Sequence, residues 1–115
     1  MISIASILVD IDAVASDHPA LEQAVSLATR SGARVTIVDV LPWVPAGVRH
    51  FVTPDVENEL VEHRLGRLKT IAKGGQNVPV TSGLLRGRPG IALIQEVLRS
   101  GHDLLVRSHG RDLAE

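Results

Sequence analysis

Cysteine is absent from this 115-residue sequence, and aromatic residues are nearly absent, with one tryptophan, one phenylalanine and no tyrosine. Without cysteine the chain has no disulfide framework, no thiolate nucleophile and no cysteine-based zinc or iron–sulfur site. With so few large rings, the core must be built from valine, leucine, isoleucine and alanine, which favours a buried β-sheet. Since the absence of disulfides fits a reducing compartment, we expect a cytoplasmic protein.

A strong charge of one sign and a long hydrophobic run are missing as well. The 12 Lys and Arg nearly balance the 13 Asp and Glu, which gives a formal net charge of -1. Such a charge provides no field that would attract nucleic acid or an acidic membrane. No stretch approaches the roughly 20 apolar residues that a membrane-spanning helix needs. We therefore expect one globular domain over residues 1–115, with no nucleic-acid partner and no membrane partner.

Strand-like and helix-like segments alternate along the chain. Apolar runs rich in β-branched residues indicate strands, apolar residues spaced three and four apart indicate helices, and Pro and Gly mark the helix ends. The expected strands are 4–11, 33–41, 78–85 and 103–107, and the expected helices are 19–30, one from Pro54 to the Gly74-Gly75 pair, and 89–99. This alternation predicts an α/β fold, doubly wound, with a mostly parallel sheet and helices on both of its faces.

The order of the strands follows from the handedness of their connections. Right-handed crossovers place the fourth strand beside the first, on the side opposite the second, so the expected order is 3-2-1-4. Ligands of such sheets bind outside the carboxyl ends of the two central strands. The loops that begin at Asp12 and Arg107 are therefore the expected binding crevice.

The helix spacing also predicts which side chains face the core. The long helix should place five apolar residues inward: Val56, Leu60, Leu68, Ile71 and Ala72. The last helix gathers four on one side: Ile91, Ile94, Val97 and Leu98.

The fourth strand presents a problem at the edge of the sheet. Residues 111–115 look like the beginning of another helix, but no further strand follows them. An edge strand exposes unpaired N–H and C=O groups, which proteins normally cover or pair. Either a second copy of the chain or another protein covers this edge, or the sequence is a truncated domain.

Four segments together resemble the universal stress protein family. They are ILVDIDAV (7–14), HPALEQAVSLATRSGARVTIVDVLP (18–42), GRP (87–89) and HDLLVRSHGR (102–111). The resemblance implies a doubly wound domain, usually dimeric, that is associated with survival under stress. The family fold has five parallel strands, the fifth of which has no counterpart in this chain. Some members bind ATP and others do not.

The resemblance also implies a nucleotide site, residue by residue. The adenine site of the family uses the Asp after the first strand, matched by Asp12, and the backbone at the end of the second strand, matched by Val40. Its phosphate site is the motif Gly-x2-Gly-x9-Gly-Ser/Thr, of which this chain matches only the second glycine, Gly110. Arg107 stands three residues before it, while Ser108 and His109 are further hydrogen-bond donors for an anion. The resemblance therefore implies a degenerate site with ATP as the cofactor to test.

Local roles remain alternatives for two of these residues. Asp12 would serve equally well as a cap of the first helix or of its loop, because Asp side chains bind nearby backbone N–H groups. For His109, a hydrogen bond within its own loop is favoured over contact with a ligand. The other histidines have no partners at metal-ligand spacing, so no metal site is expected.

An enzyme is the alternative from another class. Asp10-Ile11-Asp12 after a hydrophobic strand also resembles the signature of haloacid dehalogenase-like phosphatases, in which Asp10 would be the nucleophile and Asp12 the general acid. That chemistry also needs later acidic residues for Mg²⁺ and a Lys beside the phosphoryl group, whereas the lysines here, Lys69 and Lys73, lie in the long helix. The sequence thus predicts a non-enzymatic stress-response domain without catalytic residues.

Overall fold

The computed structural model describes residues 3–44, 46–48, 51–74 and 77–107. Strands and helices alternate in the predicted order, each close to its predicted bounds, and a short 3₁₀ helix interrupts the loop after the second strand. The elements are β1 (Ser6–Asp10), α1 (Pro19–Ser31), β2 (Arg34–Leu41), η1 (Ala46–Val48), α2 (Pro54–Ala72), β3 (Val80–Arg86), α3 (Pro89–Ser100) and β4 (Leu104–Arg107).

The helix ends follow from the residues that stand there. Each of the three α-helices begins with a proline, whose missing N–H needs no partner in the first turn. Thr53 caps α2 by accepting the N–H of Val56 at 3.3 Å. Gly32 and Gly101, at φ values of 74° and 73°, end α1 and α3 in the left-handed conformation that only glycine adopts without strain.

The four strands form one parallel sheet in the order β3-β2-β1-β4, which confirms the predicted topology. β1 lies between β2 and β4, with Asp10 paired in register with Arg107. At the amino end, the Oδ2 atom of Asp103 accepts the N–H groups of Ala5 and Ser6 at 2.8 and 3.1 Å. These bonds fix β4 beside β1, so the loops that follow both strands begin at the same edge of the sheet.

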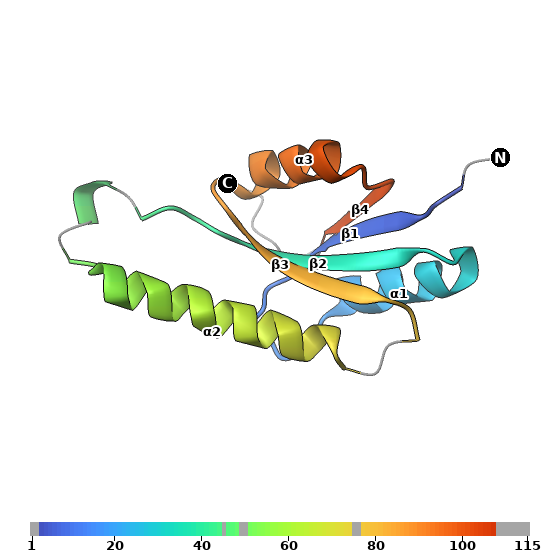
Figure 1. Ribbon diagram of the computed structural model, residues 1–115, viewed down its shortest axis with the longest axis horizontal. Helices are drawn as coiled ribbons and strands as arrows, with labels where there is room; N and C mark the ends of the chain where they lie inside the picture. The colour runs from blue at the N-terminus through green and yellow to red at the C-terminus, as the bar shows by residue number, and fades with distance from the viewer. Residues whose placement is uncertain (1–2, 45, 49–50, 75–76, 108–115) are drawn as a thin grey trace.

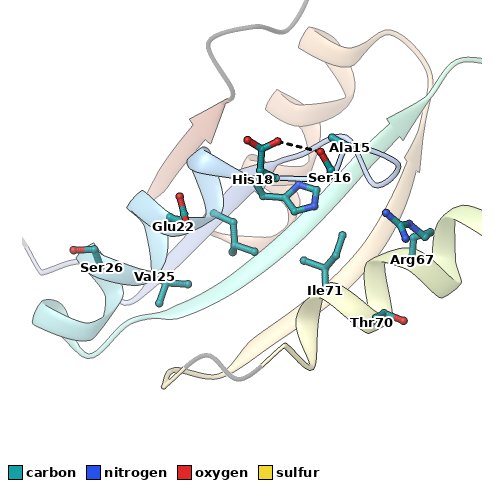
Figure 2. A pocket seen from close by; sticks show the side chains of 11 residues that line it. Ala15, Ser16, His18, Glu22, Val25, Ser26, Arg67, Thr70 and Ile71 are labelled. Atoms are coloured by element: carbon teal, nitrogen blue, oxygen red, sulfur yellow. Dashed lines mark hydrogen bonds between the residues drawn. The ribbon is translucent and has the colours of Figure 1, made fainter.

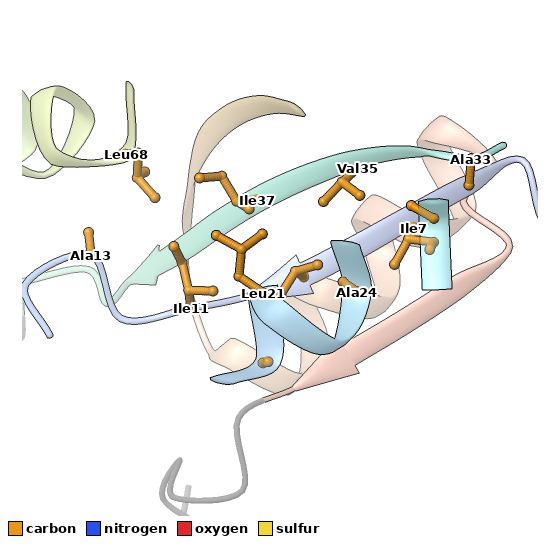
Figure 3. Packing of buried hydrophobic residues seen from close by; sticks show 12 residues of the cluster. Ile7, Ile11, Ala13, Leu21, Ala24, Ala33, Val35, Ile37 and Leu68 are labelled. Atoms are coloured by element: carbon orange, nitrogen blue, oxygen red, sulfur yellow. The ribbon is translucent and has the colours of Figure 1, made fainter. Parts of the chain in front are cut away.

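Helices cover both faces of the sheet, as the alternation predicted. α1 and α2 lie below it and α3 above it in Figure 1. Alternate strand residues point to the two sides: Ile7, Val35 and Ile37 pack with α1 and α2, whereas Leu8 and Val38 pack with α3. In Figure 3, Leu68 of α2 and Leu21 of α1 point toward the same face of the sheet. The core is aliphatic, as the shortage of rings required.

The predicted inner face of α2 is correct only for its second half. Leu68 is fully buried, and Ile71 and Ala72 pack against the same cluster. Val56 and Leu60, however, are each 48% exposed, so the prediction was wrong for these two residues. A 19-residue helix is about 28 Å long. Its amino-terminal half therefore runs beyond the ends of the strands, where it has no sheet beneath it (Figure 1).

The apolar side predicted for α3 mostly faces outward. Ala92 and Leu93 are the buried residues, and Val97 packs beside them, whereas Ile91, Ile94 and Leu98 are exposed. The prediction was wrong because this helix is apolar on more than one side. Because the four consecutive residues 91–94 are all apolar, their spacing does not determine which side of the helix is buried.

Glu96 of α3 leads to a prediction about pH. Burial raises the pKa of its carboxyl group, but hydrogen bonds from Ser100 and Arg99 and the charges of Arg99 and His102 outweigh that effect, so the pKa lies below the ordinary 4.5. A carboxyl group with a lowered pKa stabilises the fold above its unfolded pKa, and this contribution is lost as the pH falls through the folded one.

We therefore expect Glu96→Gln to lower the free energy of unfolding by less than about 1 kcal/mol at pH 7 and to have a smaller effect near pH 3. Urea unfolding of both proteins at the two pH values measures the difference. An effect of the substitution that grows toward low pH would contradict the assignment.

Candidate functional site

The candidate site lies at the carboxyl edge of β1, β2 and β4. Asp10, the last residue of β1, pairs in register with Val38 on one side and with Arg107 on the other. The N–H of Ile11 continues the contact by donating to the carbonyl of Val38 at 2.9 Å. The segment that contains Asp12 therefore leaves the sheet beside β2. The other side of the predicted crevice, the loop after Arg107, lies outside the described residues.

Asp12 is the exposed carboxylate of this edge. Its side chain is 47% exposed, and Oδ1 accepts the N–H of Val14 at 3.1 Å. Asp12 thus stabilises the turn of its own loop, as one of the two alternative roles predicted, but it does not cap α1, whose N-cap is His18. The exposed part of the carboxylate is available to accept hydrogen bonds from a ligand.

Asp39, which sequence analysis did not select, is the buried carboxylate of this edge. Its side chain is 1% exposed, and Oδ2 accepts both the N–H of Ala13 at 3.0 Å and Nη1 of Arg64 at 2.7 Å. Burial of a carboxylate is costly unless charge and hydrogen bonds compensate it, and these two donors do so. The signal that could have found it is a lone charged residue inside an apolar strand.

Two arginines of α2 reach the same segment. Nη1 of Arg64 lies 3.8 Å from Oδ1 of Asp12, in addition to its bond with Asp39. Nε of Arg67 donates to the carbonyl oxygen of Ala13 at 3.1 Å. Neither arginine was predicted from the sequence, because arginines at these positions are indistinguishable from those of an ordinary solvated helix face.

Asp10 and Arg107 form a further ion pair at this edge. Asp10 has no exposed surface, and Nε of Arg107 lies 3.3 Å from its Oδ2 atom. The arginine thus directs its charge across the sheet toward a buried carboxylate of the neighbouring strand.

The sequence model of the universal stress protein family matches residues 4–115. This chain belongs to the universal stress protein family. A comparison with curated proteins finds no significant match.

Solved structures of other universal stress proteins share the fold at low identity. The universal stress protein UspA from Lactobacillus plantarum is 17% identical with a TM-score of 0.69, over 98% of this chain and 85% of that one. A universal stress protein in complex with cAMP is 18% identical with a TM-score of 0.54, over 90% and 70%. A family protein from Arabidopsis thaliana with AMP bound is 13% identical with a TM-score of 0.53, over 93% and 78%.

The structure describes two of the residues expected at the nucleotide site of this universal stress protein, Asp12 and Val40. Asp12 and the end of β2 lie side by side, because Ala13 is bonded to Asp39. The side chain of Val40 is buried against α3, so only its backbone faces this edge. Ser108, His109 and Gly110 lie outside the described residues.

A groove of about 690 Å³ separates α1 from α2 in this universal stress protein. In Figure 2, His18, Glu22 and Val25 lie on the α1 side, Arg67 and Thr70 lie on the α2 side, and Ile71 lies between the two sides. Sequence analysis did not predict this groove. Arg67 connects it with the candidate site, because the same guanidinium that lines the groove binds the carbonyl of Ala13.

Proposed function

We propose that this chain is a non-enzymatic stress-response domain that binds an adenine nucleotide, with the base and ribose at Asp12 and the backbone of Val40. The observation that carries the proposal is an exposed carboxylate held at the shared carboxyl edge of the central strands, where ligands of doubly wound sheets bind. The relatives in complex with cAMP and with AMP support an adenine nucleotide as the ligand.

We propose that the phosphate end of this site contributes little to the affinity for the nucleotide. Where the family motif has its first glycine, Arg107 directs its side chain to Asp10. A glycine allows the backbone to approach phosphate groups closely, and an arginine at the same position does not. We therefore expect AMP and ATP to bind with similar affinities.

The phosphatase alternative requires an accessible nucleophile. Asp10 would have to reach a phosphoryl group, but its carboxylate has no exposed surface and lies against Arg107. A nucleophile must approach the reacting atom to about 3 Å, which burial of this kind opposes. The geometry therefore favours the binding function over the enzyme.

Asp12→Ala is expected to weaken the binding of AMP and of ATP about tenfold, the loss that corresponds to one hydrogen bond to a charged group. Titration calorimetry of both nucleotides, with and without Mg²⁺, measures this. The matched control is Asp17→Ala, which removes an exposed carboxylate that follows in the same loop.

Two results would contradict the proposed function. One is the absence of any heat change with millimolar AMP or ATP for the wild-type chain. The other is turnover of p-nitrophenyl phosphate that disappears in Asp10→Asn, which would support the phosphatase instead.

We also propose that a second copy of the chain or another protein covers β4. Within the described residues, β4 is the outer strand of the sheet and pairs with β1 alone. An uncovered edge strand is a template for further pairing. The solution mass of the 12.3 kDa chain tests for the second copy.

Single-domain organisation over residues 1–115 and residence in the cytoplasm remain proposals. Cell fractionation tests the second of them. No helix in the described part of the chain is long and apolar enough to cross a bilayer.

A further inference from the structure

Side chains from other elements form hydrogen bonds with the backbone of the Asp12-Ala13 segment. Ala13 is fully buried, its N–H donates to Oδ2 of Asp39 at 3.0 Å, and its carbonyl oxygen accepts Nε of Arg67 at 3.1 Å. Side chains of β2 and α2 thus engage both backbone polar groups of one loop residue. A loop residue whose N–H and C=O are both bonded has little freedom to shift.

Arg64 contacts both Asp39, which binds Ala13, and the exposed carboxylate of Asp12. Its side chain is 26% exposed, and its Nη1 atom lies 2.7 Å from Oδ2 of Asp39 and 3.8 Å from Oδ1 of Asp12. A guanidinium group presents several donors in a fixed plane, so one arginine can hold two carboxylates in a defined relation. The charge of Arg64 therefore attracts the side chain of Asp12 toward α2, in addition to the hydrogen bond that Asp12 makes within its own turn.

The packing of α2 determines where both arginines lie. They are three residues apart and hence neighbours on the helix surface. Leu68, next to Arg67, is fully buried against the sheet, which fixes that turn of the helix. The position of the Asp12 segment is thus tied to the core through the two arginines.

We propose that Arg64 and Arg67 are positioning residues of the nucleotide site, which hold the segment of Asp12 in its binding geometry before the ligand arrives. This rests on the proposed function. A segment that is fixed in advance does not have to be ordered on binding, and ordering one backbone residue costs about as much as a tenfold loss of affinity. In this role neither arginine contacts the phosphate group.

The test compares adenosine, which is uncharged, with AMP. Arg67→Gln is the main variant because its side chain is exposed, so the fold should tolerate the change. The positioning role predicts about tenfold weaker binding of both ligands, since both need the same placement of Asp12. Lys69→Gln, which removes one exposed positive charge from the same helix, is the matched control and should bind both ligands normally.

Other results would overturn the proposal. If Arg67→Gln weakens AMP but not adenosine, the arginine contacts the phosphate group and does not position Asp12. If the variant binds both ligands as tightly as the wild type, the hydrogen bond from Arg67 to Ala13 has no role in ligand binding. Arg64→Gln removes the positive charge that compensates the buried carboxylate of Asp39. This variant is therefore measured together with Arg64→Gln/Asp39→Asn, which removes both charges.

Amide hydrogen exchange separates this proposal from the proposed function. The amides of Ala13 and Val14 should exchange at least about tenfold faster in Arg67→Gln than in the wild type, while the amides of β1 stay protected. Unchanged exchange at Ala13 overturns the positioning role even if nucleotide binds. If the wild type binds neither adenosine nor AMP, the proposed function fails, and the exchange measurement still decides whether the arginines hold the segment.

Discussion

Leu68→Ala is expected to lower the free energy of unfolding by about 3 to 5 kcal/mol, which is a large part of the stability of a domain of this size. The side chain is fully buried between α2 and the sheet, so its removal leaves a cavity in addition to the lost apolar burial. Leu60→Ala on the same helix should cost less than about 1 kcal/mol, because that side chain is half-exposed.

Urea unfolding of the two variants compares them directly. Both substitutions remove the same atoms from the same helix, so differences in helix propensity cancel. Equal losses of stability would show that Leu60 is packed as well as Leu68, which would contradict the exposure of the amino-terminal half of α2.

Arg107→Gln is expected to lower the free energy of unfolding by about 2 kcal/mol, the range found for hydrogen bonds to charged groups. The buried carboxylate of Asp10 would lose a charged donor that water cannot replace. Adding Asp10→Asn should restore about 1 kcal/mol of this loss, because a neutral amide needs no cation beside it.

A double-mutant cycle of these two positions, read by thermal or urea unfolding, gives the coupling energy. Strictly additive effects would contradict the ion pair. The ion pair between Asp10 and Arg107 also gives a reason for an arginine where the family motif has a glycine, because the positive charge stabilises the pairing of β1 with β4.

The fold was predictable because its signals are local. The apolar runs of the strands, proline at the start of each helix and the glycines at 32 and 101 each determine structure within a few residues. The strand order then followed from the handedness of the crossovers. The errors at Leu60 and Ile94 arose where periodicity alone was used, because it does not say how far a sheet extends beneath a helix or which of two apolar sides it covers.

The candidate site was predictable only in part. Asp12 was found because a polar residue directly after a central strand lies at the carboxyl edge in any doubly wound sheet. Arg64 and Arg67 were missed because their contacts depend on where α2 packs relative to β2. No spacing in the sequence reports that distance.

An AMP titration of the ¹⁵N-labelled protein, followed by amide resonances, tests most directly whether the nucleotide binds at Asp12. The largest shifts should occur at Asp12, Ala13 and Val40, with Gly32 and Asp103 at the opposite edge of the sheet unchanged. Shifts confined to Val25 and Thr70 in the groove between α1 and α2, or no shifts at millimolar AMP, would contradict binding at Asp12.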